Sequence, residues 1–414
     1  MESEVRSGLV PVIVASVCLL APFTSAVRAQ DVPADAVDVI DIWNQIRHKE
    51  STAPSSEPDY RKPMKALAPV IGAKPSSGAF GGVAGNVAFF RGEPSTTRIS
   101  SLVASLTYST KKQTSATGRF LVFTRDDAWR IEGDNRAQWT SQDTYGLGTA
   151  TPADAAVDAK FNFFRVHETV YRRLPNGIFA GLGLHFDDHV DVRPGDDTPA
   201  EEWNGGGYVA YATAHGLPET RQTSGGFSAN LMRDSRDSAI DPRTGVLIAS
   251  SYRGLINGFL GGTTGWQLLH GEARTYVPLA HDGRNRLALW TFGDFVFGGT
   301  APYFDLPATG MDTYGRSARG YSEGRFRGER LVYGEIEYRT TLTANQLLGA
   351  VGFVNATTVT NSQTGERLFD SGAIGAGGGL RVLLNKRSRT NLCFDVGFGK
   401  DGSHGVYLAV QEAF

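Results

Sequence analysis

The chain has 414 residues, of which 41% are hydrophobic, 10% are aromatic and 50 are glycine. Its 41 basic and 43 acidic residues give a net charge of −2 with no basic block, which excludes the electrostatic footprint of a nucleic-acid-binding protein. Beyond the N-terminal region no run of about 20 apolar residues occurs, which excludes a helical membrane protein.

The N-terminus has the pattern of a secretory signal peptide, predicted to span residues 1–29. Residues 9–23 form its apolar core, and small residues precede the expected cleavage ahead of Gln30. The stretch before the core carries more acid than base, which departs from the usual pattern. Removal of the leader also removes Cys18 and leaves Cys393 alone, so we expect no internal disulfide.

Residues 30–74 are predicted to form a short periplasmic segment. Between Asp31 and Glu50, apolar residues recur at near-helical spacing, which favours a short amphipathic helix. Residues 51–62 are rich in serine, proline and charge, as is typical of a linker. Residues 67–78 then lead into the first predicted strand.

The remainder, residues 75–414, alternates between oily and polar side chains, which predicts an all-β, antiparallel transmembrane β-barrel. The candidate strands are residues 79–91, 97–110, 114–125, 128–140, 157–174, 177–190, 222–234, 246–258, 264–279, 285–298, 330–342, 346–355, 372–384, 391–399 and 405–414. These are about fifteen segments, whereas bacterial single-chain barrels have an even number of strands. We therefore expect sixteen, with the missing strand within residues 142–156 or 203–217.

Each strand is expected to turn its polar face to the lumen, because a lysine or arginine on the lipid face near the midplane costs about 2–4 kcal/mol. In residues 330–342, Glu335 and Glu337 belong to the lumenal face. In the last strand the same alternation places the terminal Phe414 on the lipid side and Glu412 at the aqueous rim. A C-terminal aromatic on such a strand is similar to the address read by the outer-membrane assembly machinery.

Three stretches carry a resemblance to a known family. They are residues 318–321 (Ala-Arg-Gly-Tyr), 324–327 (Gly-Arg-Phe-Arg) and 335–339 (Glu-Ile-Glu-Tyr-Arg). Together they resemble the signature loop and the following strand of the BamA/TamA family of bacterial surface antigens. Residues 233–245 and the tail from Gly375 are also similar to this family, so the resemblance covers the chain from about residue 75 onward.

The resemblance implies a long loop that folds back into the lumen, with Arg319, Gly320 and Tyr321 at its tip. A desolvated guanidinium needs acceptors, and Glu337 on the next strand faces the right way. The family has an aspartate on the strand after that, but Ala350 stands in its place here, so we expect a partial latch. Without the resemblance, Arg319 would be interpreted as one arginine on a solvated outer loop.

Other candidate sites have simpler interpretations. His185, Asp187 and His189 share a strand face, but side chains two apart on a strand are about 6.6 Å apart, so a metal would need further ligands. A polar lumenal rim is the favoured interpretation. Residues 375–379 are glycine-rich but lack nucleotide-loop spacing, which favours a close approach of backbones or a bend. We expect no cofactor and no metal.

For function, the resemblance implies a non-enzymatic protein of the outer membrane of a Gram-negative-type bacterium that inserts or transports outer-membrane proteins or lipids. A seam between the first and last strands is a feature of the family. Expected partners are outer-membrane lipid and the assembly machinery, while the client stays open. The stretch before the barrel is too short for POTRA domains. A passive pore or structural barrel is the alternative, and an outer-membrane enzyme is less favoured.

Overall fold

The computed structural model describes residues 36–47, 62–74, 77–279, 284–313, 315–412 and 414. The predicted signal peptide, and the predicted linker up to residue 61, lie outside the described residues. Within the described part, no helix has both the length and the apolarity that a membrane crossing requires.

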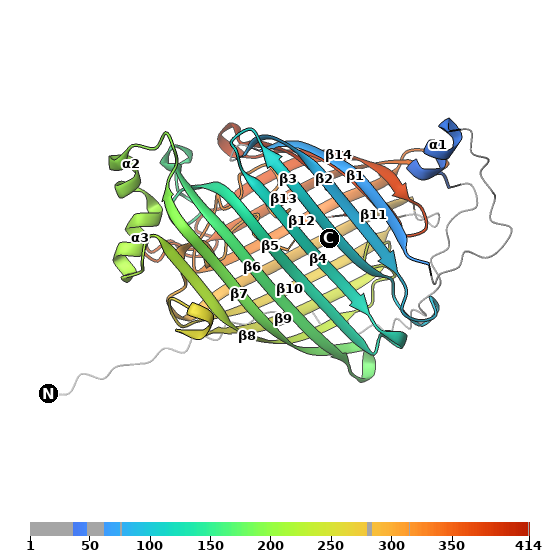
Figure 1. Ribbon diagram of the computed structural model, residues 1–414, viewed down its shortest axis with the longest axis horizontal. Helices are drawn as coiled ribbons and strands as arrows, with labels where there is room; N and C mark the ends of the chain where they lie inside the picture. Colours follow the sequence, from blue (N-terminus) through green and yellow to red (C-terminus); the bar gives the residue numbers. More distant parts are fainter. Residues whose placement is uncertain (1–35, 48–61, 75–76, 280–283, 314, 413) are drawn as a thin grey trace.

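Sixteen antiparallel strands form one closed barrel, in which each strand pairs with its neighbours in the sequence and β1 meets β16 (Figure 1). The strands are β1 Met64–Lys74, β2 Gly78–Phe89, β3 Ser100–Ser109, β4 Thr114–Phe123, β5 Trp129–Thr144, β6 Val157–Arg173, β7 Ile178–Pro194, β8 Arg221–Asp234, β9 Gly245–Leu255, β10 Trp266–Pro278, β11 Asn285–Gly299, β12 Arg330–Thr341, β13 Leu348–Val359, β14 Ala373–Asn385, β15 Thr390–Phe398 and β16 His404–Val410. The predicted sixteen-strand barrel is confirmed.

The strand missing from the prediction is β1, so the barrel begins at Met64, ahead of the predicted boundary at residue 75. The two places where we expected it were wrong: residues 203–217 hold most of two short helices, and residues 142–156 hold the end of β5 and a loop. Pro69, in the middle of β1, argues against a strand because proline has no backbone N–H to donate. Edge strands tolerate proline, and β1 is an edge at the joint described below.

Helix α1 (Val39–Ile46) lies at one end of the barrel, which we call the α1 end (Figure 1). It lies within the stretch where a helix was predicted. Asp38 and Asp41 begin it with a reciprocal capping box. Lys386, in the turn between β14 and β15, donates to the Asp41 carboxylate at 2.7 Å and to the Ala36 carbonyl at 3.1 Å. The helix is thereby attached to the end of β14.

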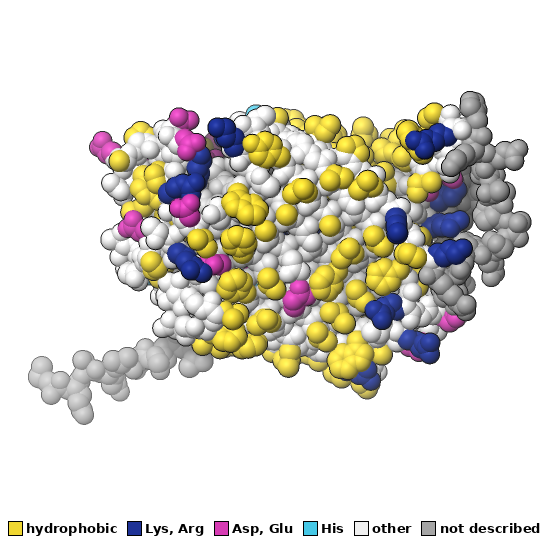
Figure 2. All heavy atoms as spheres, viewed as in Figure 1, with side chains coloured by type: hydrophobic (Ala, Val, Ile, Leu, Met, Phe, Trp, Pro, Cys, Tyr) yellow, Lys and Arg dark blue, Asp and Glu magenta, His cyan; other side chains and the backbone are white. Residues whose placement is uncertain are grey.

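Helices α2 (Ala200–Gly205) and α3 (Gly207–His215) lie over the opposite end, which we call the α2–α3 end (Figure 1). The ring of Tyr208 packs on Tyr303 and Phe304 from the loop after β11, with centroids 5.5 and 5.0 Å apart. Apolar side chains cover much of the outer wall between the two ends, and Lys and Arg side chains gather toward the α1 end (Figure 2).

Strand β12 shows the alternation that a wall between lipid and water requires. Ile336 is 54% exposed on the outer face, whereas Glu335 and Glu337 are 3% and 0% exposed and point into the barrel. The predicted facing of this strand is confirmed.

Ile336→Lys is expected to lower the free energy of unfolding by about 2–4 kcal/mol, because it places a charge in the middle of the lipid face. Leu348→Lys is the matched control, since Leu348 is outward-facing but is the first residue of β13. Its expected cost is about 0–1 kcal/mol. Urea titrations in lipid vesicles, followed by tryptophan fluorescence, measure both. Equal losses would contradict the membrane-spanning assignment of this face.

The joint between β1 and β16 is shorter than the other strand pairings. Within the part of the chain that the structure describes, the two strands are in register through Ala73 and Val406. Strand β16 pairs with β15, in contrast, all the way from Phe398↔His404 to Leu392↔Val410. Val406 lies toward the start of β16, so the pairing with β1 lies toward the α2–α3 end.

Toward the α1 end, β1 and the C-terminal strands overlap instead of meeting edge to edge. Ala68 and Val70 of β1 are buried in one cluster with Leu384 of β14 and Val410 of β16. Leu384 and Val410 belong to the outward-facing sets of their strands, so β1 lies over the outer face of the C-terminal strands. This overlap buries apolar side chains where backbone pairing is missing.

Candidate functional site

The loop between β11 and β12, residues 300–329, folds into the lumen, and most of its side chains are buried. Arg327 is 1% exposed and anchors the returning half of the loop. Its guanidinium donates to the Tyr303 carbonyl at 2.8 Å and to the Gln142 side chain of β5 at 3.2 Å. The predicted inward-folded loop is confirmed.

Arg319 is completely buried at the tip of this loop and contacts three carboxylates. Its guanidinium donates to Asp395 of β15 at 2.7 Å and to Glu335 of β12 at 2.5 Å, and it also binds Glu337. Burial by itself lowers the pKa of Arg319, but the three carboxylates outweigh burial and hold the pKa well above its usual value. The loop tip is thereby tied to two different strands of the wall.

Sequence reasoning anticipated Glu337 but missed Glu335 and Asp395 as partners of Arg319. It also misplaced the facing of β13. Ala350 belongs to the outward-facing set, and the position beneath the guanidinium is Phe353, whose ring centroid lies 3.6 Å from the central carbon of Arg319. We expected a partial latch because Ala350 stands where the family has an aspartate, but Asp395 of β15 supplies a further carboxylate to Arg319.

Gly320 and Tyr321 continue the contact from the loop tip to the C-terminal strands. Gly320 has φ +112°, and a Cβ there would lie 2.7 Å from the backbone of Phe398, so only glycine fits. Its N–H donates to the hydroxyl of Tyr407 on β16 at 3.0 Å. The Tyr321 hydroxyl donates to the Ile374 carbonyl on β14 at 2.6 Å.

The glycines of β14 and β15 make room for this loop tip. A Cβ on Gly375 would lie 2.7 Å from the Arg319 carbonyl oxygen, and a Cβ on Gly397 would lie 2.7 Å from the Gly320 nitrogen. The interpretation of residues 375–379 as a close approach of backbones is therefore confirmed at Gly375.

The last residue, Phe414, lies inside the barrel and not on its lipid face. Phe414 is 3% exposed and stacks on Trp290 of β11, with ring centroids 5.1 Å apart. Its carbonyl accepts a hydrogen bond from Arg339 at 3.0 Å. The expectation of a lipid-facing Phe414 was wrong because the chain leaves the strand after Val410 and turns inward.

Glu412 follows the same inward path. Its carboxylate contacts the Arg381 guanidinium at 2.9 Å and accepts from Asn391 at 3.0 Å, and it is buried instead of lying at an aqueous rim. Arg381 also contacts Asp395, the carboxylate that Arg319 uses. The loop tip and the C-terminal tail therefore share one network of buried ion pairs.

His185, Asp187 and His189 do share the lumenal face of β7, but each has its own partners. His185 bonds to Ser228 at 2.8 Å, and Asp187 pairs with Arg165 at 2.6 Å. His189 stacks on the ring of Phe163, with ring centroids 4.5 Å apart. Among the described residues, no group of three or more His, Cys, Asp or Glu side chains is arranged to hold a metal ion.

Residues 86–401 match the Omp85 superfamily domain. The fold is similar to BamA from Haemophilus ducreyi lacking POTRA domains 1–3, with 14% identity and a TM-score of 0.52 over 85% of this chain and 69% of that chain. It is also similar to CdiB from Acinetobacter baumannii (12% identity, TM-score 0.52, 84% of this chain and 59% of that chain) and from Escherichia coli (11%, 0.53, 86% and 63%). The chain thus spans less than two thirds of both CdiB chains. A comparison with curated proteins gives no match.

Proposed function

The chain belongs to the Omp85 superfamily, and we propose that it acts in the bacterial outer membrane, without enzymatic chemistry, by inserting or transferring proteins or lipids through the joint between β1 and β16. The observation that carries this proposal is the short pairing at Ala73 and Val406, among the residues that the structure describes, in a barrel whose other strands pair along their length. An edge with unpaired N–H and C=O groups is a template for another strand, and separation here breaks few hydrogen bonds.

The loop latch, which consists of Arg319, Gly320, Tyr321 and Glu337, supports the same proposal. Through Tyr407 of β16 and Asp395 of β15 it holds the last two strands of the barrel from inside the lumen. Release of the loop would therefore free β16 from its lumenal support. This arrangement favours a gated joint over a passive pore, because the space inside the barrel is occupied by the loop and the tail.

The connections between strands support a proposed orientation of the barrel. The turns at the α1 end include residues 174–177 and 386–389, whereas the opposite end carries the long connections 195–220 and 300–329. Outer-membrane barrels have short periplasmic turns and longer external loops. We place the α1 end in the periplasm, with residues 1–29 as a signal peptide and α1 as a short periplasmic element beside the joint.

Depletion of the protein in its host tests the proposed role. The expected result is a change in the lipid or barrel-protein content of the outer membrane, restored by the wild-type gene. A composition that does not change on depletion, together with a large steady conductance of the purified barrel in planar bilayers, would favour the passive pore instead.

Phe414 is proposed to act also as the C-terminal address for assembly. Phe414→Ala is expected to cost about 3 kcal/mol in vitro, and Trp290→Ala, which removes the same ring contact and also the hydrogen bond to Glu272, is expected to cost at least as much. In cells, Phe414→Ala is expected to reduce the amount of folded barrel more than Trp290→Ala does, because only the first removes the address. Heat-modifiable mobility on gels measures the folded fraction. Equal amounts of folded barrel would assign Phe414 to packing alone.

A further inference from the structure

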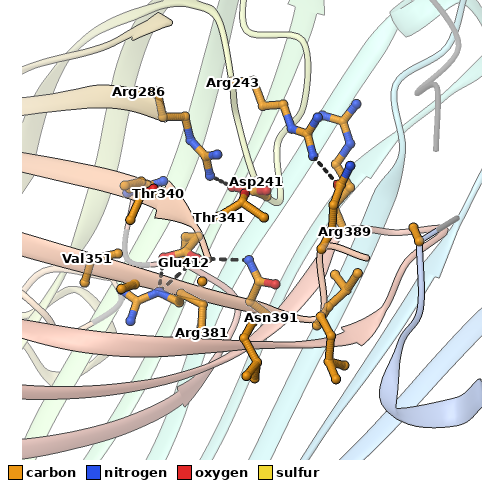
Figure 3. Close-up of a pocket in the computed structure, with 18 of the residues that line it drawn as sticks. Asp241, Arg243, Arg286, Thr340, Thr341, Val351, Arg381, Arg389, Asn391 and Glu412 are labelled. Atoms are coloured by element: carbon orange, nitrogen blue, oxygen red, sulfur yellow. Dashed lines mark hydrogen bonds and ion pairs between the residues drawn. The ribbon is translucent and has the colours of Figure 1, made fainter. Parts of the chain in front are cut away.

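A cavity of about 60 Å³ lies in the lumen at the α1 end, bounded by the ends of several strands and their turns (Figure 3). Its lining is rich in cations: Arg243, Arg286, Arg339, Arg381, Lys386 and Arg389. Two carboxylates, those of Asp241 and Glu412, also line it. A buried cluster of this composition is costly unless anions balance it.

Five of these cations have a carboxylate partner. Arg286 pairs with Asp241, Arg339 with Glu337, Arg381 with Glu412, Lys386 with Asp41 and Arg389 with Asp237. In the described ranges, no carboxylate lies within ion-pair distance of the Arg243 side chain, whose guanidinium donates only to the amide oxygen of Gln346 at 3.3 Å. Burial and the nearby guanidiniums of Arg389 and Arg286 lower the pKa of Arg243.

Several guanidinium nitrogens of this cavity are buried without an acceptor among the described residues. They are Nε of Arg243, Nε of Arg286, Nη1 of Arg339 and Nη2 of Arg381. Arg286, Arg339 and Arg381 are 7%, 2% and 5% exposed, so bulk water does not satisfy these donors. Unfilled donors on four side chains that line one cavity indicate an acceptor with several oxygens.

We propose that this cavity binds a phosphate group, presented either on a lipid headgroup or as free inorganic phosphate. The N–H groups of a guanidinium form a fixed fork that matches the oxygens of a phosphate group. For several such forks around one cavity, a phosphate is a better acceptor than a single carboxylate would be. A water molecule needs about 10–15 Å³ on the same scale of volume, so the cavity holds about four to six water-sized groups, comparable with the oxygens of one phosphate. The turns that carry Arg243, Lys386 and Arg389 form its rim at the α1 end.

Titration calorimetry of the full-length protein, in a neutral detergent and a phosphate-free buffer, tests the proposal. The probes are inorganic phosphate, dihexanoyl phosphatidic acid and, as the phosphate-free control, dihexanoylglycerol. Saturable binding of either phosphate compound, weakened by salt, is the expected result. Phosphatidic acid that binds at least tenfold more tightly than inorganic phosphate identifies a lipid source, and equal affinities identify free phosphate.

Arg243→Gln is expected to weaken this binding at least tenfold. Arg387→Gln is the matched control, because Arg387 is an exposed arginine on the turn that also carries Arg389 but does not line the cavity. Without ligand, Arg243→Gln is expected to melt no lower than the wild type, because it removes a cation from a cation-rich site. A purely structural role for Arg243 predicts a lower melting temperature.

Absence of saturable binding by both phosphate compounds, or equal binding by Arg243→Gln and Arg387→Gln, would overturn the proposal. Arg389→Gln is the second variant in case Arg243→Gln does not fold, with the same tenfold loss expected. The measurement needs no client and no membrane transfer. Its failure is therefore distinct from failure of the proposed transfer role.

Discussion

Arg319→Ala is expected to lower the free energy of unfolding by about 3–5 kcal/mol, because it leaves the buried carboxylate of Glu335 without a cation and takes one cation away from each of Glu337 and Asp395. The same substitution is expected to release the loop tip from β12 and to weaken its hold on β15, where Arg316 still pairs with Asp395 at 2.8 Å. Ions should then pass where the loop had blocked the lumen. The wild-type protein in planar bilayers should show small, erratic openings, and the variant should show larger and steadier ones.

Two control variants separate the latch from a general loss of charge. Arg330→Ala removes an exposed arginine at the start of β12 and is expected to leave both stability and conductance close to wild type. Arg319→Lys keeps the charge but loses the fork that reaches several carboxylates at once, so it should fall between the wild type and Arg319→Ala. Arg319→Ala with unchanged conductance would show that the rest of the loop holds itself in the lumen.

A disulfide across the joint is expected to abolish the transfer role while leaving the barrel folded. Ala73 and Val406 lie directly opposite each other, and antiparallel partners have Cα atoms about 4.5–5.5 Å apart, within the range that a disulfide spans. The double variant Ala73→Cys with Val406→Cys, oxidised in the host, should therefore reproduce the depletion phenotype. Reduction should restore the outer-membrane composition.

The matched control uses one of the same cysteines. Val396 is also a direct partner of Val406, on β15, so Val396→Cys with Val406→Cys closes a disulfide within the C-terminal hairpin and leaves the joint free. This variant is expected to behave as wild type. The native Cys393 is fully buried and is not expected to compete. If both double variants complement equally when oxidised, transfer does not pass through the joint.

Most strands of the barrel could be predicted from the sequence, because a membrane imposes an alternation of apolar and polar residues that is visible within each strand. Each outward position of β12 must be oily and each inward position is free to be charged, so the facing of Glu337 was predicted from its neighbours alone. Strand β1 escaped because Pro69 interrupts it and because it covers other strands, so Ala68 and Val70 are buried on the face expected to meet water. In β1 the inward-facing residues therefore pack against other strands, whereas in the rest of the wall they face the lumen.

The candidate site was predicted only in part because its contacts join residues far apart in the chain. Arg319 and Glu337 lie on one loop and the next strand, so a local interpretation could pair them. Asp395 reaches Arg319 only after β13 and β14 have curved the wall around the loop tip. The inward turn of Phe414 depends on contacts with Trp290 and Arg339. The alternation of residues near the C-terminus cannot predict contacts with residues so far away in the chain.

The buried position of Phe414 has a practical consequence for anyone who purifies or labels this protein. A peptide fused after the last residue would begin within a tight ring of aromatic side chains, so an affinity tag there would either displace Phe414 or stay hidden from its resin. The exposed connection around Gly365, between β13 and β14, is the better place for an epitope or a fluorophore.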